Sequence, residues 1–253
     1  MIGIFDSGLG GLSVAHAIRA QFKTADLLYY GDTRNAPYGE KSADELARLT
    51  VQGLQFLHTR GAGSIVSACN SISTSLAVSL LDAYEIPAEN VIEMVGPTVA
   101  SFKTSTARVL VVATTATVRS GIYQNAFRMI GKEIDAIPIP TLAGAIERGA
   151  LREEIDGIVR SALYGMPGDA YDTLILGCTH YPFVVDSFKN VLGGNVSIFD
   201  PAEAVAVRVA KRFWPREVGN GKARFVVSAD TPAFRLKVAE LFPECIGEIE
   251  VLQ

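Results

Sequence analysis

The chain has 253 residues, of which 49% are hydrophobic and 20% charged, a length that suits one large domain or two of ordinary size. Its formal net charge of −4 excludes the strongly basic surface that proteins binding nucleic acid or anionic membranes need. Its three cysteines are an odd number and too few for a disulfide scaffold, which favours a reducing cytoplasm.

The amino-terminal segment and the overall hydropathy indicate a soluble protein. Residues 1–6 lack the basic region of a signal peptide and reach an acid at Asp6. No stretch approaches the roughly 20 apolar residues that a membrane-spanning helix needs. We therefore expect a cytoplasmic enzyme or binding protein.

Short apolar runs alternate with longer amphipathic segments, which is the pattern of βαβ units and a parallel sheet. In chain order we predict strands at residues 2–5, 27–30, 65–68, 91–95, 109–113, 136–139, 174–176, 196–199 and 225–228. The predicted helices lie at residues 12–22, 42–59, from the third strand to 81, 120–130, 142–163, 184–192, 203–213 and 231–241. Ser42 and Glu45 have the spacing of a capping box, and the segment 142–163 is expected to divide at Gly149.

An internal repeat predicts two related halves. Cys69 and Cys178 each follow an apolar strand, and shifting residues 2–6 by their separation of 178 − 69 = 109 gives residues 111–115, which overlap the strand at 109–113. We predict two pseudo-symmetric α/β domains, each a mainly parallel sheet flanked by helices, with the active site in the cleft between them. The first would comprise residues 1–96 with 208–253 and the second residues 97–207, divided near Gly96-Pro97.

The glycine-rich turn at residues 6–11 follows a strand and precedes a helix. A dinucleotide-binding fingerprint would need glycine at position 13, which is Ser13, so that interpretation is weak. Glycines here allow backbone N–H groups to approach an anion at a helix amino terminus, although a plain tight turn is the alternative. Asp6 stands where a functional carboxylate would stand.

In the later polar loop at residues 31–42, Tyr38 and Gly39 could offer a hydroxyl and a backbone N–H to a ligand.

The two cysteines carry the strongest chemical signal. Each is followed by hydrogen-bonding residues, and a helix amino terminus should lower the thiol pKa below about 8.5. The chain lacks the arginine of a phosphatase loop and has no C-x-x-C pair. Zinc would find three soft ligands, Cys69, Cys178 and His180, without a standard spacing. Cys245 has no motif and is expected to be structural.

Two thiols facing one cleft suit the inversion of a stereocentre by proton transfer. One thiol removes a proton from one face while the other delivers a proton to the opposite face. Without a cofactor, hydrogen-bond donors must stabilise the carbanion, and Asn70, Ser71 and Thr179 are placed to do so.

These motifs, taken together, resemble the cofactor-independent aspartate/glutamate racemase superfamily, and within it the glutamate racemases. The resemblance covers most of the chain and rests on the segments at residues 6–11, 31–32, 37–39, 68–70, 113–120, 177–182 and 200–202. It implies glutamate as the substrate, no cofactor, no metal, and D-glutamate production for peptidoglycan. It implies no partner among nucleic acids or membranes, and a homodimer is allowed.

The resemblance also assigns the site residue by residue. The catalytic cysteines fall on Cys69 and Cys178, with Asp6 as the auxiliary acid/base beside the first and His180 beside the second. Glu147 matches a helper glutamate. The substrate-binding positions fall on Asp6, Ser7, Tyr38, Gly39, Asn70, Ser71, Thr179 and His180, with Pro37, Thr114 and Thr117 as secondary candidates.

Three alternatives stay open. An aspartate racemase or related small-acid isomerase belongs to the same superfamily, but its aspartate-specific members tend to carry an acid where this chain has His180. A binding protein for acidic amino acids would not need both Cys69 and Cys178. A zinc-dependent hydrolase would retain metal through purification.

Overall fold

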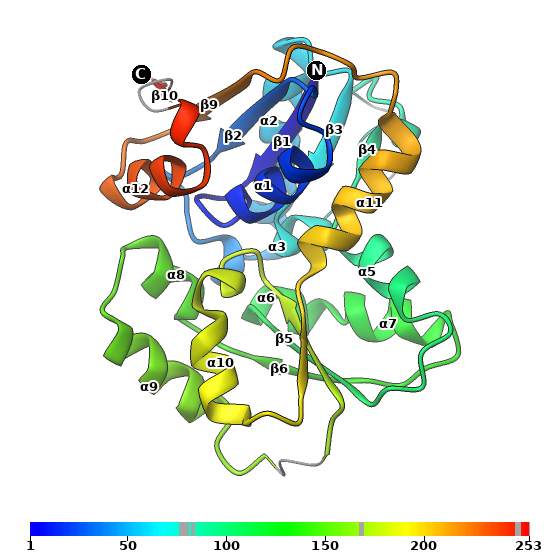
Figure 1. Ribbon diagram of the computed structural model, residues 1–253, viewed down its shortest axis with the longest axis vertical. Coiled ribbons are helices and arrows are strands. Elements are labelled where there is room, and N and C mark those ends of the chain that lie inside the picture. Colours follow the sequence, from blue (N-terminus) through cyan, green and yellow to red (C-terminus); the bar gives the residue numbers. More distant parts are fainter. Residues whose placement is uncertain (76–80, 82–83, 167–169, 246–248, 253) are drawn as a thin grey trace.

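The chain forms two parallel sheets, one above the other in Figure 1, and helices flank each sheet. This computed structural model describes residues 1–75, 81, 84–166, 170–245 and 249–252. We call the upper sheet with its helices the first lobe and the lower sheet with its helices the second lobe. The predicted fold class, two α/β halves built on parallel sheets, is confirmed.

Neighbouring strands are parallel throughout both sheets. The first sheet has the order β10-β9-β2-β1-β3-β4 and the second the order β6-β5-β7-β8. The strands of the first sheet are β1 (Ile2–Asp6), β2 (Leu27–Gly31), β3 (Ser64–Ser67), β4 (Val91–Ile92), β9 (Ala223–Val227) and β10 (Ile249–Val251). Those of the second are β5 (Val109–Ala113), β6 (Asp135–Pro138), β7 (Thr173–Gly177) and β8 (Ser197–Phe199).

The same four-strand order occurs in both lobes. β1 lies between β2 and β3, with β4 beyond, just as β5 lies between β6 and β7, with β8 beyond. The carbonyl of Asp6 accepts the N–H of Asp32, as the carbonyl of Ala113 accepts that of Ile139, so Asp6 and Ala113 are equivalent. The strands are thus offset by 113 − 6 = 107 residues rather than the predicted 109. The second lobe simply has two more residues between its first strand and its cysteine.

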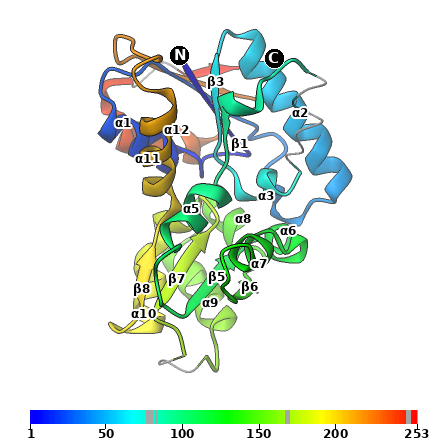
Figure 2. The same ribbon diagram turned by 90° about the vertical axis from the view of Figure 1, so that its right-hand side faces the viewer.

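Helices cover the faces of both sheets (Figures 1 and 2). One face of the first sheet carries α1 (Leu12–Gln21), α11 (Pro201–Phe213) and α12 (Pro232–Leu241), and the other carries α2 (Ala43–Thr59). On the second sheet, α8 (Leu142–Glu147), α9 (Arg152–Ala162) and α10 (Val185–Leu192) lie opposite α5 (Val95–Ser101) and α7 (Ile122–Arg128). The short α3 (Asn70–Ser73) follows β3, and α6 (Thr115–Ser120) follows β5. Single 3₁₀ turns occupy Tyr38–Glu40, Ala88–Asn90, Tyr181–Val184 and Pro243–Cys245.

Strand side chains alternate between two cores. Ile4 joins the cluster beneath α1, while the next residue, Phe5, joins the cluster beneath α2. In the second lobe Leu110 and Val111 divide in the same way. Successive strand residues point to opposite faces, so a sheet covered on both faces needs apolar residues throughout its strands. This burial accounts for the short continuous apolar runs in the sequence.

Two local predictions about helix ends are confirmed. Ser42 caps α2: its hydroxyl accepts the N–H of Glu45 at 3.3 Å, and the Glu45 carboxylate accepts the N–H of Ser42 at 3.1 Å. Gly149, at φ +70°, lies between α8 and α9 and gives the chain the left-handed turn that separates them.

Several predicted boundaries are wrong. β4 ends at Ile92, because the Glu93 carboxylate accepts the N–H groups of Val95 and Gly96 at 2.6 Å each and thereby starts α5. Pro97 therefore lies in the first turn of a helix, where its missing N–H costs nothing, and does not interrupt the structure. The predicted helix 120–130 corresponds to α7, which begins only after Gly121, and α6 on the other side of this glycine was not predicted.

Other differences concern the segment after β3 and the carboxyl terminus. α3 ends at Ser73, and the predicted continuation to Leu81 falls largely on residues 76–80, outside the described residues. β10 was not predicted, since its three residues are too few to show a period. The proposed domain borders at 96/97 and 207/208 fall inside α5 and α11 and stay a prediction. Within the described ranges, no helix is both long and apolar enough to cross a membrane.

Candidate active site

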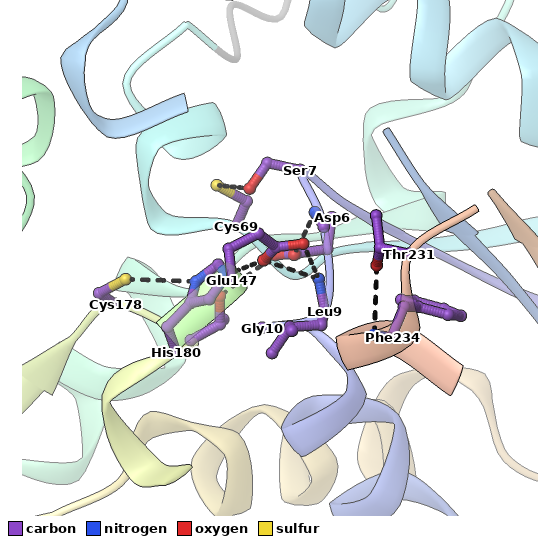
Figure 3. Close-up of polar contacts among 12 residues, drawn as sticks. Asp6, Ser7, Leu9, Gly10, Cys69, Glu147, Cys178, His180, Thr231 and Phe234 are labelled. Atoms are coloured by element: carbon purple, nitrogen blue, oxygen red, sulfur yellow. Dashed lines mark hydrogen bonds and ion pairs between the residues drawn. The ribbon is translucent and has the colours of Figure 1, made fainter. Parts of the chain in front are cut away.

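The carboxyl ends of three strands, from both sheets, meet at one pocket. Ser7 follows β1, Cys69 follows β3, and Cys178 follows β7, and all three line this pocket. Figure 3 shows the two thiols reaching it from opposite lobes. Ligands of parallel sheets bind at this edge, so the site lies where the topology predicts it.

Most of the residues predicted for the site line this pocket. The lining residues are Ser7, Pro37, Tyr38, Gly39, Cys69, Asn70, Ser71, Thr114, Ala143, Cys178 and His180. Four other predicted residues are not among the lining residues: Glu147 contacts His180, Thr117 contacts Thr114, and Asp6 and Thr179 are bonded to each other. Ala143 was not predicted, because a small apolar helix residue carries no chemical signal in the sequence.

Cys69 lies at the amino terminus of α3 and faces the β1–α1 turn. Its thiol donates to Ser7 Oγ at 3.8 Å. Burial, and after it the nearby Asp6 carboxylate, raise the pKa of this thiol to about 12, although the N–H of Ile72 lowers it in part. The predicted lowering of its pKa is therefore wrong, because one turn of helix cannot offset the loss of water around the thiolate.

Cys178 belongs to a chain of contacts with two titratable groups. Its sulfur lies 3.7 Å from His180 Nδ1, and His180 Nε2 lies 2.5 Å from the Glu147 carboxylate. Both carboxylate oxygens of Glu147 accept the N–H of Leu9 at 3.1 Å, so a first-lobe backbone group completes the chain (Figure 3). Burial lowers the pKa of His180, but Cys178 and Glu147 together outweigh it and leave this pKa well above its ordinary value.

The glycines of the β1–α1 turn make this chain of contacts sterically possible. A Cβ on Gly8 would lie 2.3 Å from a Glu147 carboxylate oxygen, and a Cβ on Gly10 would lie 2.5 Å from His180 Nδ1. The turn therefore serves close packing against the second lobe. From the sequence these glycines indicated either anion binding or a plain tight turn, and their close contact with the second lobe was not predicted.

Asp6 lies beneath the same turn and is fully buried. Its carboxylate accepts the N–H of Gly8 at 2.9 Å and the hydroxyl of Thr179, from the second lobe, at 3.1 Å. Burial raises the pKa of Asp6, and the His180 charge only partly opposes this. Asp6 is thus an acid whose proton is held more tightly than usual, close to Cys69.

The Tyr38 hydroxyl is held by a neighbouring carboxylate. It donates to Asp32 at 2.6 Å, and Asp32 also accepts from Ser228 Oγ at 2.7 Å. Tyr38 lines the pocket, and a contact of its hydroxyl with a ligand stays a prediction. Asp32 was missed as the residue that holds the loop, since its partner Ser228 is 196 positions away.

Three hydroxyls form a small cluster at the border of the lobes. Thr114 Oγ1 lies 3.0 Å from both Ser71 Oγ and Thr117 Oγ1. Thr114 also caps α6. Ser71 and Thr114 line the pocket and can donate to or accept from a ligand there, whereas Thr117 holds Thr114 from outside the lining.

The candidate zinc ligands are Cys69, Cys178 and His180. In the described part of the chain, no group of three or more His, Cys, Asp or Glu side chains is arranged to hold a metal ion. Cys69, Cys178 and His180 are therefore not brought together as a zinc ligand set.

Comparison with known proteins identifies the family. The model of the Asp/Glu/hydantoin racemase family matches residues 9–209. The chain belongs to this family. A glutamate racemase from Desulforudis audaxviator is 35% identical, and the match covers 100% of this chain and 98% of that protein.

Solved members of the racemase family share the whole fold. A glutamate racemase from Francisella tularensis, solved with D-glutamate, superposes with a TM-score of 0.88 at 26% identity, covering 100% of this chain and 97% of that one. A glutamate racemase isoform from Bacillus anthracis gives a TM-score of 0.87 at 28% identity over the same shares of the two chains.

Proposed function

We propose that this protein interconverts L- and D-glutamate, with Cys69 and Cys178 as the two acid/base groups and no cofactor. One observation carries the proposal: the two thiols line one pocket from opposite lobes. A substrate between them would present one face of its α-carbon to each sulfur. The names of the relatives supply the choice of glutamate.

The proposed reaction is a proton exchange between two faces. The thiolate of one cysteine takes the α-proton as the C–H bond breaks, and the thiol of the other gives its proton to the opposite face. The first cysteine ends as a thiol and the second as a thiolate, so protons balance and the roles reverse in the other direction. Cys69, whose pKa is raised to about 12, suits the proton-donating role in the resting protein.

The negative charge that develops on the substrate needs hydrogen-bond donors. Ser7, Asn70 and Ser71 line the pocket with donor groups. Preorganised donors in a site that excludes water stabilise such charge without reorganisation during the reaction. Asp6 beside Cys69, and His180 with Glu147 beside Cys178, would supply and accept protons as each thiol changes state.

The direct test uses circular dichroism on D-glutamate and D-aspartate separately. The enzyme is first dialysed against a chelator and freed of pyridoxal phosphate. We expect the signal of glutamate alone to decay to zero. Decay with aspartate alone would transfer the proposal to aspartate. Activity that requires added metal or pyridoxal phosphate would refute the cofactor-free mechanism, and binding without any decay would indicate a binding protein.

We also propose that the D-glutamate formed supplies peptidoglycan synthesis in the cytoplasm. The support is family membership and the cysteine usage rather than any contact in the pocket. Depletion of the protein in its own cells should cause lysis that external D-glutamate prevents. Growth unaffected by depletion would contradict this role. A homodimer stays a prediction.

A further inference from the structure

One side chain of the pocket has half of its amide engaged and the other half free. Asn70 lines the pocket, and its Oδ1 accepts a hydrogen bond of 2.6 Å from the hydroxyl of Tyr123. Its Nδ2 is buried and has no hydrogen-bond partner among the described residues. A buried donor without a partner is costly, so a ligand that supplies an acceptor there gains the full hydrogen bond.

Tyr123 comes from the other side of the cleft. It lies on α7 of the second lobe, while Asn70 begins α3 of the first, directly after Cys69. The tyrosine is 1% exposed and lies in the core packed between α5, α7 and the second sheet. Its position is therefore fixed by packing, whereas an asparagine amide can rotate by half a turn at little cost. Burial raises the pKa of Tyr123, so the phenol keeps its proton and stays a donor.

We propose that Tyr123 is a positioning residue that sets the orientation of the Asn70 amide for substrate binding. With Oδ1 held by the phenol, the NH₂ group is the half presented to a carboxylate of the amino acid. The reversed amide would direct an acceptor oxygen at that anion and repel it. The inference rests on the proposed function, because it takes an acidic amino acid as the ligand.

The proposal predicts a coupled pair of residues. Asn70→Ala should lower kcat/KM by about 10- to 150-fold, the effect of losing a hydrogen bond to a charged group. Tyr123→Phe keeps the ring and its packing and should lower kcat/KM by about two- to tenfold, the worth of an ordinary hydrogen bond. Because the substrate carboxylate is already charged before the reaction and gains further charge in the carbanion, this loss should raise KM, with a smaller decrease in kcat.

The decisive experiment is a double-mutant cycle. Once Asn70 is alanine, no amide remains to be oriented, so Tyr123→Phe should change kcat/KM by less than about twofold in that background. Kinetics are measured from both enantiomers; since their equilibrium constant is one, the two kcat/KM values must agree in every variant, which checks the data. Thermal unfolding of each variant shows that it is folded.

Tyr181→Phe is the matched control. Tyr181 is also a buried tyrosine of the second lobe, and its hydroxyl donates to the backbone carbonyl of Ile139 at 3.2 Å, not to a pocket side chain. Its loss should leave KM for glutamate within about twofold of wild type, since no pocket side chain is released. An equal loss for Tyr123→Phe with and without Asn70, or wild-type KM in Tyr123→Phe, would overturn the positioning role. Absence of glutamate racemisation in the unmodified protein would instead overturn the proposed function.

Discussion

At the scale of single residues, the two thiols of the pocket differ in their neighbours although their strands are equivalent. Cys69 lies beside a hydroxyl and a buried carboxyl, Ser7 and Asp6. Cys178 lies beside an imidazole that is itself bonded to the Glu147 carboxylate. The topological repeat therefore places the two sulfurs, while the polar groups around them differ between the lobes.

The first prediction assigns each thiol to one enantiomer. By family resemblance Cys178 takes the α-proton of L-glutamate and Cys69 that of D-glutamate. In heavy water, Cys69→Ala should place deuterium in L-glutamate through the remaining thiol, with hardly any racemisation, and leave D-glutamate unlabelled. Cys178→Ala should do the reverse. Proton NMR of the α-position measures the exchange.

Exchange is the proper readout because kcat/KM values in the two directions must stay equal in any variant. Cys245→Ala is the control, since Cys245 is buried in the first-lobe core, and its removal should leave racemisation intact. Fast racemisation by either Cys69→Ala or Cys178→Ala would exclude the two-thiol mechanism. Labelling of the opposite enantiomer would reverse the assignment.

The second prediction concerns His180 and pH. Cys178 and Glu147 raise its pKa against burial, so the imidazolium persists above pH 6.5 and is lost as the pH rises through the raised value. In Glu147→Gln, that pKa falls. The alkaline limb of the pH profile of kcat/KM should move down by about one pH unit, equivalent to about 1.4 kcal/mol.

The matched control is Glu153→Gln, an exposed glutamate in the first turn of α9. Its pH profile should coincide with that of the wild type. His180 should also make the stability of the fold depend on pH. Its stabilising contribution is fully present below pH 6.5 and is lost as the pH rises through its raised pKa in the folded protein. If the alkaline limb does not move in Glu147→Gln, Glu147 does not raise the pKa of His180.

At the scale of elements, the β1–α1 turn connects the lobes by close approach. Its backbone N–H at Leu9 reaches Glu147, and its glycines leave no room for side chains there. A turn that accepted a Cβ would hold Glu147 and His180 further away. The glycines of this motif are therefore required by packing against the second lobe.

The third prediction is that Gly10→Ala lowers kcat/KM by about tenfold or more, because its Cβ would displace His180 from Cys178 by a fraction of an ångström to an ångström. Gly157→Ala is the control: this glycine lies within α9 with open space around its Cβ position. It should raise stability by about 0.5–1 kcal/mol and leave activity unchanged. Wild-type kinetics in Gly10→Ala would show that the turn accommodates a Cβ at this position without displacing His180.

At the scale of the whole molecule, the reactive groups lie between the lobes and not within either of them. Cys69 and Cys178 are only 6% and 5% exposed, so the two lobes together shield both thiols from solvent. Each lobe alone contributes one thiol. The function we propose therefore requires both lobes, because each contributes one of the two pocket thiols.

The fourth prediction is that glutamate protects the enzyme from thiol alkylation. Iodoacetamide should inactivate the protein by modifying Cys69 or Cys178, which line the pocket. Bound D-glutamate should slow the loss of activity by occupying the pocket. Peptide mapping by mass spectrometry identifies the modified thiol. Inactivation with Cys245 as the sole modified residue would remove the two pocket thiols from the proposed site.

The sequence by itself determined most of the strands, the capping box of α2 and the position of one cysteine after a strand in each half. These features follow from local rules: strand faces buried on both sides demand apolar runs, and a cap needs Ser42 and Glu45 three residues apart. Resemblance to a family supplied the site residues, and the structure places most of them around one pocket.

Only the tertiary structure decided how those residues act on one another. The bond from Leu9 to Glu147 spans 138 positions and that from Tyr123 to Asn70 spans 53, and neither has a local signature. The raised pKa of Cys69 reverses the expectation from helix position, because desolvation depends on the packing of both lobes around the thiol. Local sequence specifies which groups are present, whereas burial and long-range contacts specify their orientation and their charge.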